Sequence, residues 1–253
     1  MSDKDPAAPK APVVGILAQS GLHVVITLIA LNRLGYTAFM ISTRLTSLAI
    51  DRLLSLTECN TVLTTSNFHN TLGEIPKDKQ LSILPLLSHS DYYGKESPVF
   101  ARQYDPENES KKIAVILHSS GSTGMPKPIF LAHGSCIAAF AVNMNMRAFL
   151  TSPVFHSHGF YEVFRSIFSR KPIYLTNYAL PLTRQSVTQT IEYIKPALFH
   201  CVPYVLKLLA ESEQGIRALA SVDLVLYAGS SCPDDLGDSL VSRGVFLVGN
   251  YGA

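Results

Sequence analysis

The chain has 253 residues, of which 47% are hydrophobic and 16% are charged, and its formal net charge at pH 7 is +2. This composition excludes a disordered chain, which would be poor in aliphatic residues and rich in charge. The 15 glycines and 15 prolines follow no period, which excludes a collagen-like or low-complexity fibre. The small net charge does not favour nucleic acid or an anionic membrane as a partner. The length suits one large α/β domain or two small ones.

The beginning of the chain contains an apolar stretch that resembles a membrane anchor only by its hydropathy. Residues 1–12 mix acidic residues, lysines and prolines, and we expect them to form a flexible tail. Residues 13–34 are mostly apolar, but residues 19–21 are Gln-Ser-Gly and His23 follows. A lipid-facing helix would bury these polar groups at considerable cost. The pattern therefore predicts a buried strand, a turn and a buried helix, and no membrane partner.

Apolar strands alternate with amphipathic helices along the rest of the chain. We predict strands at 36–42, 60–66, 81–87, 113–117, 171–177, 197–203, 223–229 and 245–250. We predict helices at 47–56, 182–194, 204–212 and 234–242. Residues 88–111 are polar and are interpreted as a long surface connection. This order predicts an α/β fold with mostly parallel sheets flanked by helices.

The four cysteines are widely spaced and form no Cys-x-x-Cys pair, so they indicate neither a zinc knuckle nor a redox dithiol. A small number of cysteines in a large domain is typical of reduced, buried thiols in a cytoplasmic protein. We therefore expect no disulfide, no metal ligand and a cytoplasmic location. The cysteines are Cys59, Cys136, Cys201 and Cys232.

The strongest chemical signal is the segment from Ser119 to Lys127, which follows the predicted strand at 113–117. Serine and threonine hydroxyls, glycines and a lysine lie within nine positions. Glycines allow backbone N–H groups to converge, and the lysine supplies positive charge, which together suit a polyphosphate. A Walker A loop is excluded because Pro126 stands where its second glycine is required. A surface hairpin without a ligand is the alternative for a generic loop of this composition.

The loop is one of three blocks that resemble the adenylate-forming enzymes, a superfamily of acyl-CoA synthetases, peptide-synthetase adenylation domains and luciferases. Its sequence, SSGSTGMPK, resembles their signature loop, and the residues carried over are Ser119, Ser120, Gly121, Ser122, Thr123, Gly124 and Lys127. The second block, PVFHSHGF, resembles a Pro-x-x-His-x-x-Gly stretch in which His156 lies between the acyl and nucleotide pockets. His158 is an additional histidine to which the resemblance gives no role. The third block resembles the turns that contact adenine, with Gly229, Ser230, Ser231, Gly249, Asn250, Tyr251 and Gly252, of which Tyr251 would stack on the purine.

The resemblance implies that ATP and Mg²⁺ convert a carboxylic acid into an acyl-adenylate, with Lys127 and His156 as catalytic residues. Pro128 and the segment 17–36 are most similar to fungal reductase-type, peptide-synthetase-like proteins of secondary metabolism. These contain carrier and reductase domains, which are expected as partners. On this basis residues 13–253 form an incomplete adenylation domain that lacks the Mg²⁺-binding glutamate and the small C-terminal domain.

Three hypotheses about the function of the chain remain open. The first is a ligase fragment with little activity alone, either a peptide-synthetase-like enzyme or an acyl-CoA synthetase. The second is a non-catalytic nucleotide-binding or interaction module. The third is a truncated gene product without a settled fold, because half a domain exposes strand edges and apolar surface.

Overall fold

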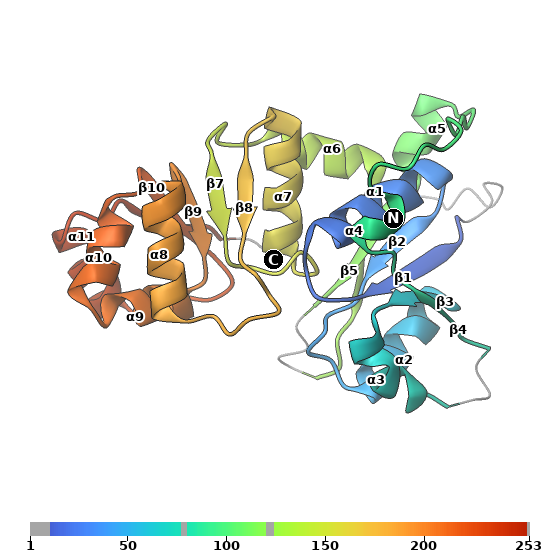
Figure 1. Cartoon of the computed structure of the whole chain (residues 1–253), viewed down its shortest axis with the longest axis horizontal. Helices are drawn as coiled ribbons and strands as arrows, with labels where there is room; N and C mark the ends of the chain where they lie inside the picture. The colour runs from blue at the N-terminus through green and yellow to red at the C-terminus, as the bar shows by residue number, and fades with distance from the viewer. Residues whose placement is uncertain (1–10, 77–79, 120–123, 252–253) are drawn as a thin grey trace, which may run out of the picture. The chain divides into compact units, whose positions relative to one another are not determined.

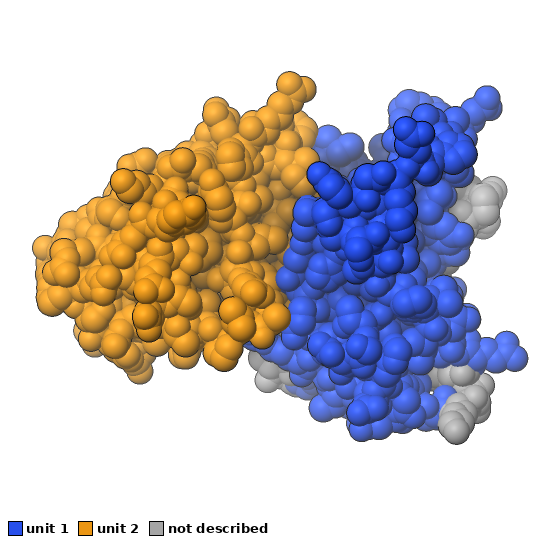
Figure 2. Space-filling view, in the orientation of Figure 1, with its two compact units in different colours: residues 1–137 blue, residues 138–253 orange. Residues whose placement is uncertain are grey.

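The chain forms two compact units, residues 1–137 and residues 138–253 (Figure 2). The structure is a computed structural model, and it describes residues 11–76, 80–119 and 124–251. The expected flexible tail at 1–12 lies almost entirely outside the described residues. Each unit is built around a sheet of its own, with helices against the sheet (Figure 1). The predicted α/β fold is confirmed.

The sheet of the first unit is parallel except at one edge. Its strand order is β4-β3-β1-β2-β5-β6, and only the β5–β6 pair among the described strands is antiparallel. Consecutive strands of the β5–β6 pair form a hairpin, whereas the parallel strands are joined by crossovers. The strands are β1 (Val13–Leu17), β2 (Thr37–Met40), β3 (Thr61–Thr64), β4 (Ser82–Pro85), β5 (Ile113–His118) and β6 (Pro128–Ala132).

The apolar stretch at 13–34 forms strand β1 and helix α1 (Leu22–Leu34), as predicted. Helix α1 ends at Gly35, whose φ of 91° is in the left-handed region that favours glycine. Helix α2 (Ser47–Thr57) begins at Thr46, whose hydroxyl accepts a hydrogen bond from the Ala49 amide. Among the described residues, no helix combines the length and the apolar character needed to cross a bilayer. Shorter elements in this unit are a 3₁₀ turn, η1 (Ser66–Phe68), and α3 (His69–Gly73); α6 (His133–Ala141) contains the boundary between the units.

The polar segment at 88–111, which the structure describes throughout, has no buried residue, as predicted for a long surface connection, and it also contains two short helices, α4 (His89–Tyr92) and α5 (Pro106–Lys111). Ser88 and Asp91 form a capping box at α4. Asp105 caps α5, and Pro106 occupies its first turn. Local capping is therefore sufficient to form short helices in a segment that contributes little to the core.

The sheet of the second unit is entirely parallel among its described strands, in the order β11-β10-β9-β7-β8. The chain passes from β7 to β8 on one side and then returns to β9 on the other side of β7. The strands are β7 (Ala148–Leu150), β8 (Ile173–Leu175), β9 (Leu198–Cys201), β10 (Leu224–Tyr227) and β11 (Leu247–Gly249). The helices are α7 (Ser157–Ser169), α8 (Arg184–Ile194), α9 (Pro203–Ala210), α10 (Glu213–Ala220) and α11 (Asp234–Ser242).

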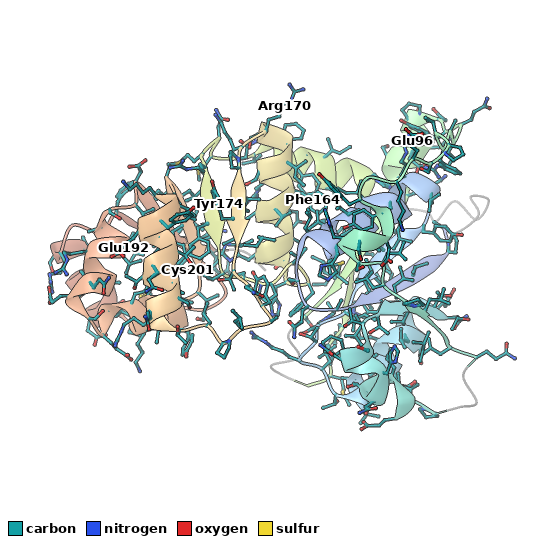
Figure 3. All side chains as sticks on the ribbon, viewed as in Figure 1. Glu96, Phe164, Arg170, Tyr174, Glu192 and Cys201 are labelled. Atoms are coloured by element: carbon teal, nitrogen blue, oxygen red, sulfur yellow. The ribbon has the colours of Figure 1, made fainter. Side chains whose placement is uncertain are left out.

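Aromatic and aliphatic side chains fill the core of the second unit. Phe149 on β7 stacks on Phe199 on β9 with ring centroids 5.2 Å apart. Leucines and isoleucines of α8, α9 and α10 pack around this pair. On α7, Phe164 (labelled in Figure 3) stacks on Phe140 at 5.3 Å and contacts Phe160. Burying a side chain of this size stabilises the folded state by about 1.5–3 kcal/mol relative to leaving it exposed. The parallel sheet therefore packs on a substantial core.

All four cysteines are free thiols, three of them buried and Cys232 partly buried. Burial raises the pKa of Cys136 to about 11 and also raises the pKa of Cys59 and Cys201. Cysteines with such raised pKa values stay protonated at neutral pH and are poor nucleophiles.

Candidate functional site

The predicted phosphate-binding loop lies at the end of the β5–β6 hairpin in the first unit. His118 of β5 pairs with Pro128 of β6 at the last position of the ladder. Beyond it, the Ser119 amide donates to the Lys127 carbonyl oxygen at 3.0 Å, and the Lys127 amide donates to Ser119 Oγ at 3.0 Å. These two bonds close the neck of the loop and leave Gly124 and the Lys127 side chain exposed. The predicted residues Ser120, Gly121, Ser122 and Thr123 lie outside the described residues.

His118 fixes the entry to this loop, although the sequence analysis gave it no role. Its Nδ1 lies 2.9 Å from the Ser119 carbonyl oxygen, and its Nε2 accepts a hydrogen bond from the Ser42 amide at 3.0 Å. Burial lowers the pKa of His118, and a neutral ring with the proton on Nδ1 satisfies both contacts. The imidazole therefore joins the turn after β2 to the first residue of the loop. His118 is only 6% exposed. This burial depends on the pairing of β2 with β5, which the sequence alone does not show.

Six of the predicted adenine-contacting residues line one pocket in the second unit, with a volume of about 430 Å³. It lies beyond the carboxyl ends of β10 and β11, which is the edge where parallel α/β sheets bind ligands. Tyr251 is 99% exposed, so its ring is available to a planar ligand. The predicted residue Gly252 lies outside the described residues. The pocket is lined by Tyr227, Gly229, Ser230, Ser231, Gly249, Asn250 and Tyr251.

Two backbone features shape this pocket. Gly229 has a φ of 93°, a conformation that strains any residue with a Cβ. The Asn250 amide donates to the Tyr227 carbonyl oxygen at 2.8 Å, which continues the β10–β11 pairing into the turn. Tyr227 is the lining residue to which the sequence analysis gave no role. Its place as the last residue of β10, directly before the Ala-Gly turn, is the signal that could have identified it.

His156 is the residue that precedes helix α7, and it does not line this pocket as described. Its amide donates to the Pro153 carbonyl oxygen at 3.1 Å, and its carbonyl accepts from the Phe160 amide at 2.8 Å. The half-buried ring lies against Phe155, with centroids 4.8 Å apart. A Cβ on Gly159 would lie 2.0 Å from the Pro153 carbonyl oxygen. The proline and the glycine of the motif therefore allow a tight turn that presents His156 at the start of α7.

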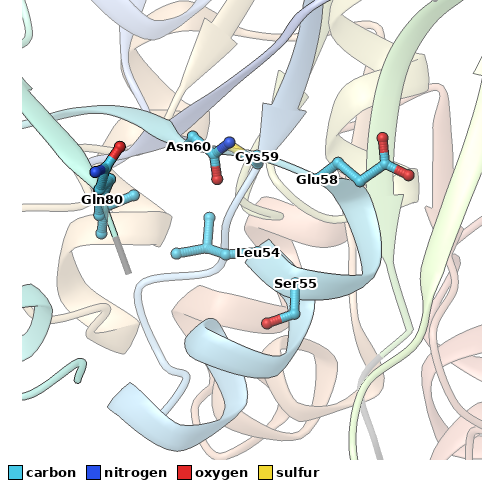
Figure 4. Close-up of a pocket in the computed structure, with 7 residues that line it drawn as sticks. Leu54, Ser55, Glu58, Cys59, Asn60 and Gln80 are labelled. Atoms are coloured by element: carbon cyan, nitrogen blue, oxygen red, sulfur yellow. The ribbon is translucent and has the colours of Figure 1, made fainter. Parts of the chain in front are cut away.

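Another pocket, in the first unit, has no evident chemistry. It has a volume of about 280 Å³ and lies beside the end of α2 and the beginning of β3 (Figure 4). Leu54, Ser55, Glu58, Cys59 and Asn60 line it, together with Gln80 and Leu81. The Cys59 thiol is buried and its pKa is raised. Glu58 is the single carboxylate among the described residues that line this pocket, and it belongs to no group of three possible metal ligands in the described part of the chain.

Known proteins are similar to this chain over nearly its whole length. The model of the family described as "AMP-binding enzyme" matches residues 8–253. A carboxylic acid reductase of Neurospora crassa is 26% identical over 261 residues, which are 95% of this chain and 25% of that protein. An adenylate-forming reductase of Aspergillus terreus is 24% identical, over 99% of this chain and 25% of that protein. The chain thus spans about a quarter of the length of these relatives.

Solved structures share the fold. The inhibitor-bound N-terminal domain of FACL13 from Mycobacterium tuberculosis matches with a TM-score of 0.80 and 17% identity, covering 98% of this chain and 64% of that one. The o-succinylbenzoate coenzyme A synthetase of Bacillus subtilis in complex with AMP matches with a TM-score of 0.73 and 20% identity, covering 98% and 62%. At this identity the likeness shows the fold alone.

Proposed function

The chain belongs to the AMP-binding enzyme family, and on this premise we propose that it binds ATP for the activation of a carboxylic acid. In the proposed reaction, a carboxylate oxygen of the acid forms a bond to the α-phosphorus of ATP. The bond from that phosphorus to pyrophosphate breaks, giving an acyl-adenylate. The chain would supply part of the machinery of a larger enzyme, since it spans about a quarter of its curated relatives.

The observation that carries this proposal is the pocket beyond β10 and β11. The tertiary structure gathers Gly229, Ser230 and Ser231 from one turn with Gly249, Asn250 and Tyr251 from another. Small residues leave room for a planar base, and an exposed aromatic ring offers a stacking surface. We assign the adenine of ATP or AMP to this pocket, with Tyr251 against the purine.

The triphosphate is assigned to the loop between Ser119 and Lys127. The exposed Lys127 ammonium would offset the charge of the phosphates, which otherwise repel the incoming carboxylate. His156 would orient the carboxylate and would not act as a base, because an ionised carboxylate is already a nucleophile. The described residues that line the adenine pocket include no carboxylate, so the proposal gives Mg²⁺ no ligand there.

We propose that the larger enzyme is peptide-synthetase-like and belongs to secondary metabolism, acting in the cytoplasm with carrier and reductase regions as partners. Several of the curated relatives are described as adenylate-forming reductases of fungi. An acyl-CoA synthetase-type ligase is the second candidate. It is supported by a 4-chlorobenzoate–CoA ligase of Arthrobacter that is 27% identical over 83% of this chain.

The proposal is tested by titrating the purified chain with Mg-ATP in a calorimeter and by measuring ATP–pyrophosphate exchange with a panel of carboxylic acids. Circular dichroism establishes first that the chain is folded. Saturable binding together with acid-dependent exchange is the expected result. Binding without exchange would favour a non-catalytic nucleotide-binding module. A folded chain that binds no ATP would contradict the proposal.

A further inference from the structure

A buried cluster of nitrogen and oxygen ligands lies in the second unit, and none of its residues is among those assigned to ATP. His158 and Glu162 lie four residues apart on α7, and His200 lies on β9. Residues four apart on a helix share one face, so both α7 side chains can reach the same point. Each residue offers one ligand atom, and these atoms all lie within 4.8 Å of one another.

The cluster lies where the sheet changes its direction of winding. His200 pairs with Leu150, the last residue of β7, and α7 begins shortly after that strand. The chain winds from β7 to β8 on one side and to β9 on the other, and Figure 1 shows α7 beside the β7–β8 edge. In open α/β sheets, ligands bind at the carboxyl ends of the strands at such a switch point. The position therefore favours a bound ligand independently of the residue types.

The separations within the cluster suit a metal ion. His200 Nε2 lies 3.2 Å from Glu162 Oε2, and these side chains are only 2% and 8% exposed. Two ligands at zinc–nitrogen and zinc–oxygen bond lengths in a tetrahedral site lie about 3.4 Å apart. His158 Nε2 is also buried and has no hydrogen-bond partner among the described residues. The third ligand atom is therefore available and needs only a small side-chain movement.

Neighbouring side chains orient two of the three ligands, His158 and Glu162. Ser152 Oγ lies 3.2 Å from His158 Nδ1, which leaves Nε2 as the free ligand atom. Arg165 Nη1 donates to Glu162 Oε1 at 2.6 Å, so Oε2 is the oxygen that faces His200. Such outer contacts fix the orientation of ligands in metal sites. The Arg165 charge also opposes a cation, which limits the affinity.

We propose that His158, Glu162 and His200 form a binding site for a divalent transition-metal ion, with Zn²⁺ as the ion that fits the donor set. Two imidazole nitrogens and one carboxylate oxygen suit zinc, whereas Mg²⁺ prefers oxygen ligands alone. The site is thus distinct from any Mg²⁺ that accompanies ATP. The alternative is a buried Glu162–Arg165–His200 network without an ion, which leaves His158 Nε2 unsatisfied.

The experiment titrates the untagged, metal-free chain with Co²⁺ and follows the visible absorption, which reports nitrogen ligands and coordination geometry. We expect saturation at one equivalent, displacement by Zn²⁺ and no displacement by Mg²⁺. His158→Asn and His200→Gln should each weaken binding by at least about tenfold. His69→Asn is the matched control, because His69 is exposed on α3 in the other unit.

Circular dichroism and thermal unfolding establish that each variant is folded. If His200→Gln does not fold, His158→Asn and the rise in melting temperature of the wild-type chain with Zn²⁺ decide the question. A folded wild-type chain without saturable Co²⁺ absorption would overturn the proposal. Binding that is unchanged in His158→Asn, or equally lost in His69→Asn, would also overturn it.

Discussion

The two units present their candidate binding residues in different ways. In the first unit, the Ser119 amide donates to the Lys127 carbonyl oxygen and the Lys127 amide donates to Ser119 Oγ, which closes the neck of the loop, and Lys127 itself is exposed. In the second unit, the candidate residues lie at the carboxyl ends of parallel strands and at the start of α7. There the Gly159 backbone is packed against Pro153.

This difference indicates where a substitution should change both ligand affinity and the stability of the fold, and where it should change affinity alone. Substituting an exposed loop side chain removes a ligand contact and leaves the core unchanged. Substituting Gly159 at the start of α7 changes packing as well as the presentation of His156, because its Cβ would lie 2.0 Å from the Pro153 carbonyl oxygen. The comparison therefore predicts separable effects in the first unit and combined effects around α7.

The largest effect is expected for Gly159→Ala. Its Cβ would lie 2.0 Å from the Pro153 carbonyl oxygen and 2.8 Å from that of Ser152, so the start of α7 must move. Overpacking of this kind costs about 3 kcal/mol of unfolding free energy, measurable by urea denaturation. Gly237→Ala in α11 is the control: nothing lies within 4 Å of that Cβ, and it should be neutral or stabilising. Equal stability of the two variants would contradict the account of the motif.

Lys127→Ala is expected to weaken ATP binding by about 10- to 100-fold, because a hydrogen bond to a charged group contributes about 1.5–3 kcal/mol. The urea midpoint should not change, since the side chain is exposed. Calorimetric titration with Mg-ATP measures the affinity for ATP. Lys207→Ala, an exposed lysine on α9 of the other unit, should bind ATP as the wild type does. Unchanged ATP affinity in Lys127→Ala would contradict the assignment of Lys127 to the ATP site.

The smallest effect is expected for Tyr251→Ala, which removes a stacking surface that contributes about 1 kcal/mol, or about fivefold in affinity. AMP and ATP should weaken alike, and inorganic triphosphate should bind as before. The control is Tyr193→Ala on α8, where the side chain is 89% exposed and outside the pocket. If Tyr251→Ala weakened triphosphate as much as ATP, the stacking role would be wrong.

Much of the fold followed from local sequence patterns. The apolar run at 13–34 interrupted by Gln-Ser-Gly predicted β1 and α1, and the later alternation predicted β8 to β11 together with α8, α9 and α11. The same analysis gave no element to β6, β7 or α7. Strand β7 has only three residues, while the start of β6 at Pro128 and the residues of α7 were interpreted as parts of motifs and not for their period.

The sequence by itself determined the fold class, the family resemblance and the residue types of the loop and turns, because strand periodicity and contiguous motifs are local properties. Only the tertiary structure decided which distant residues meet. Parallel pairing of β10 with β11 brings Tyr227 beside the turn at 249–251. The pairing of β7 with β9 brings His200 to α7, where it meets His158 and Glu162. These contacts join residues about 20 to 40 positions apart, and their geometry depends on strand register and helix packing, which no local pattern specifies.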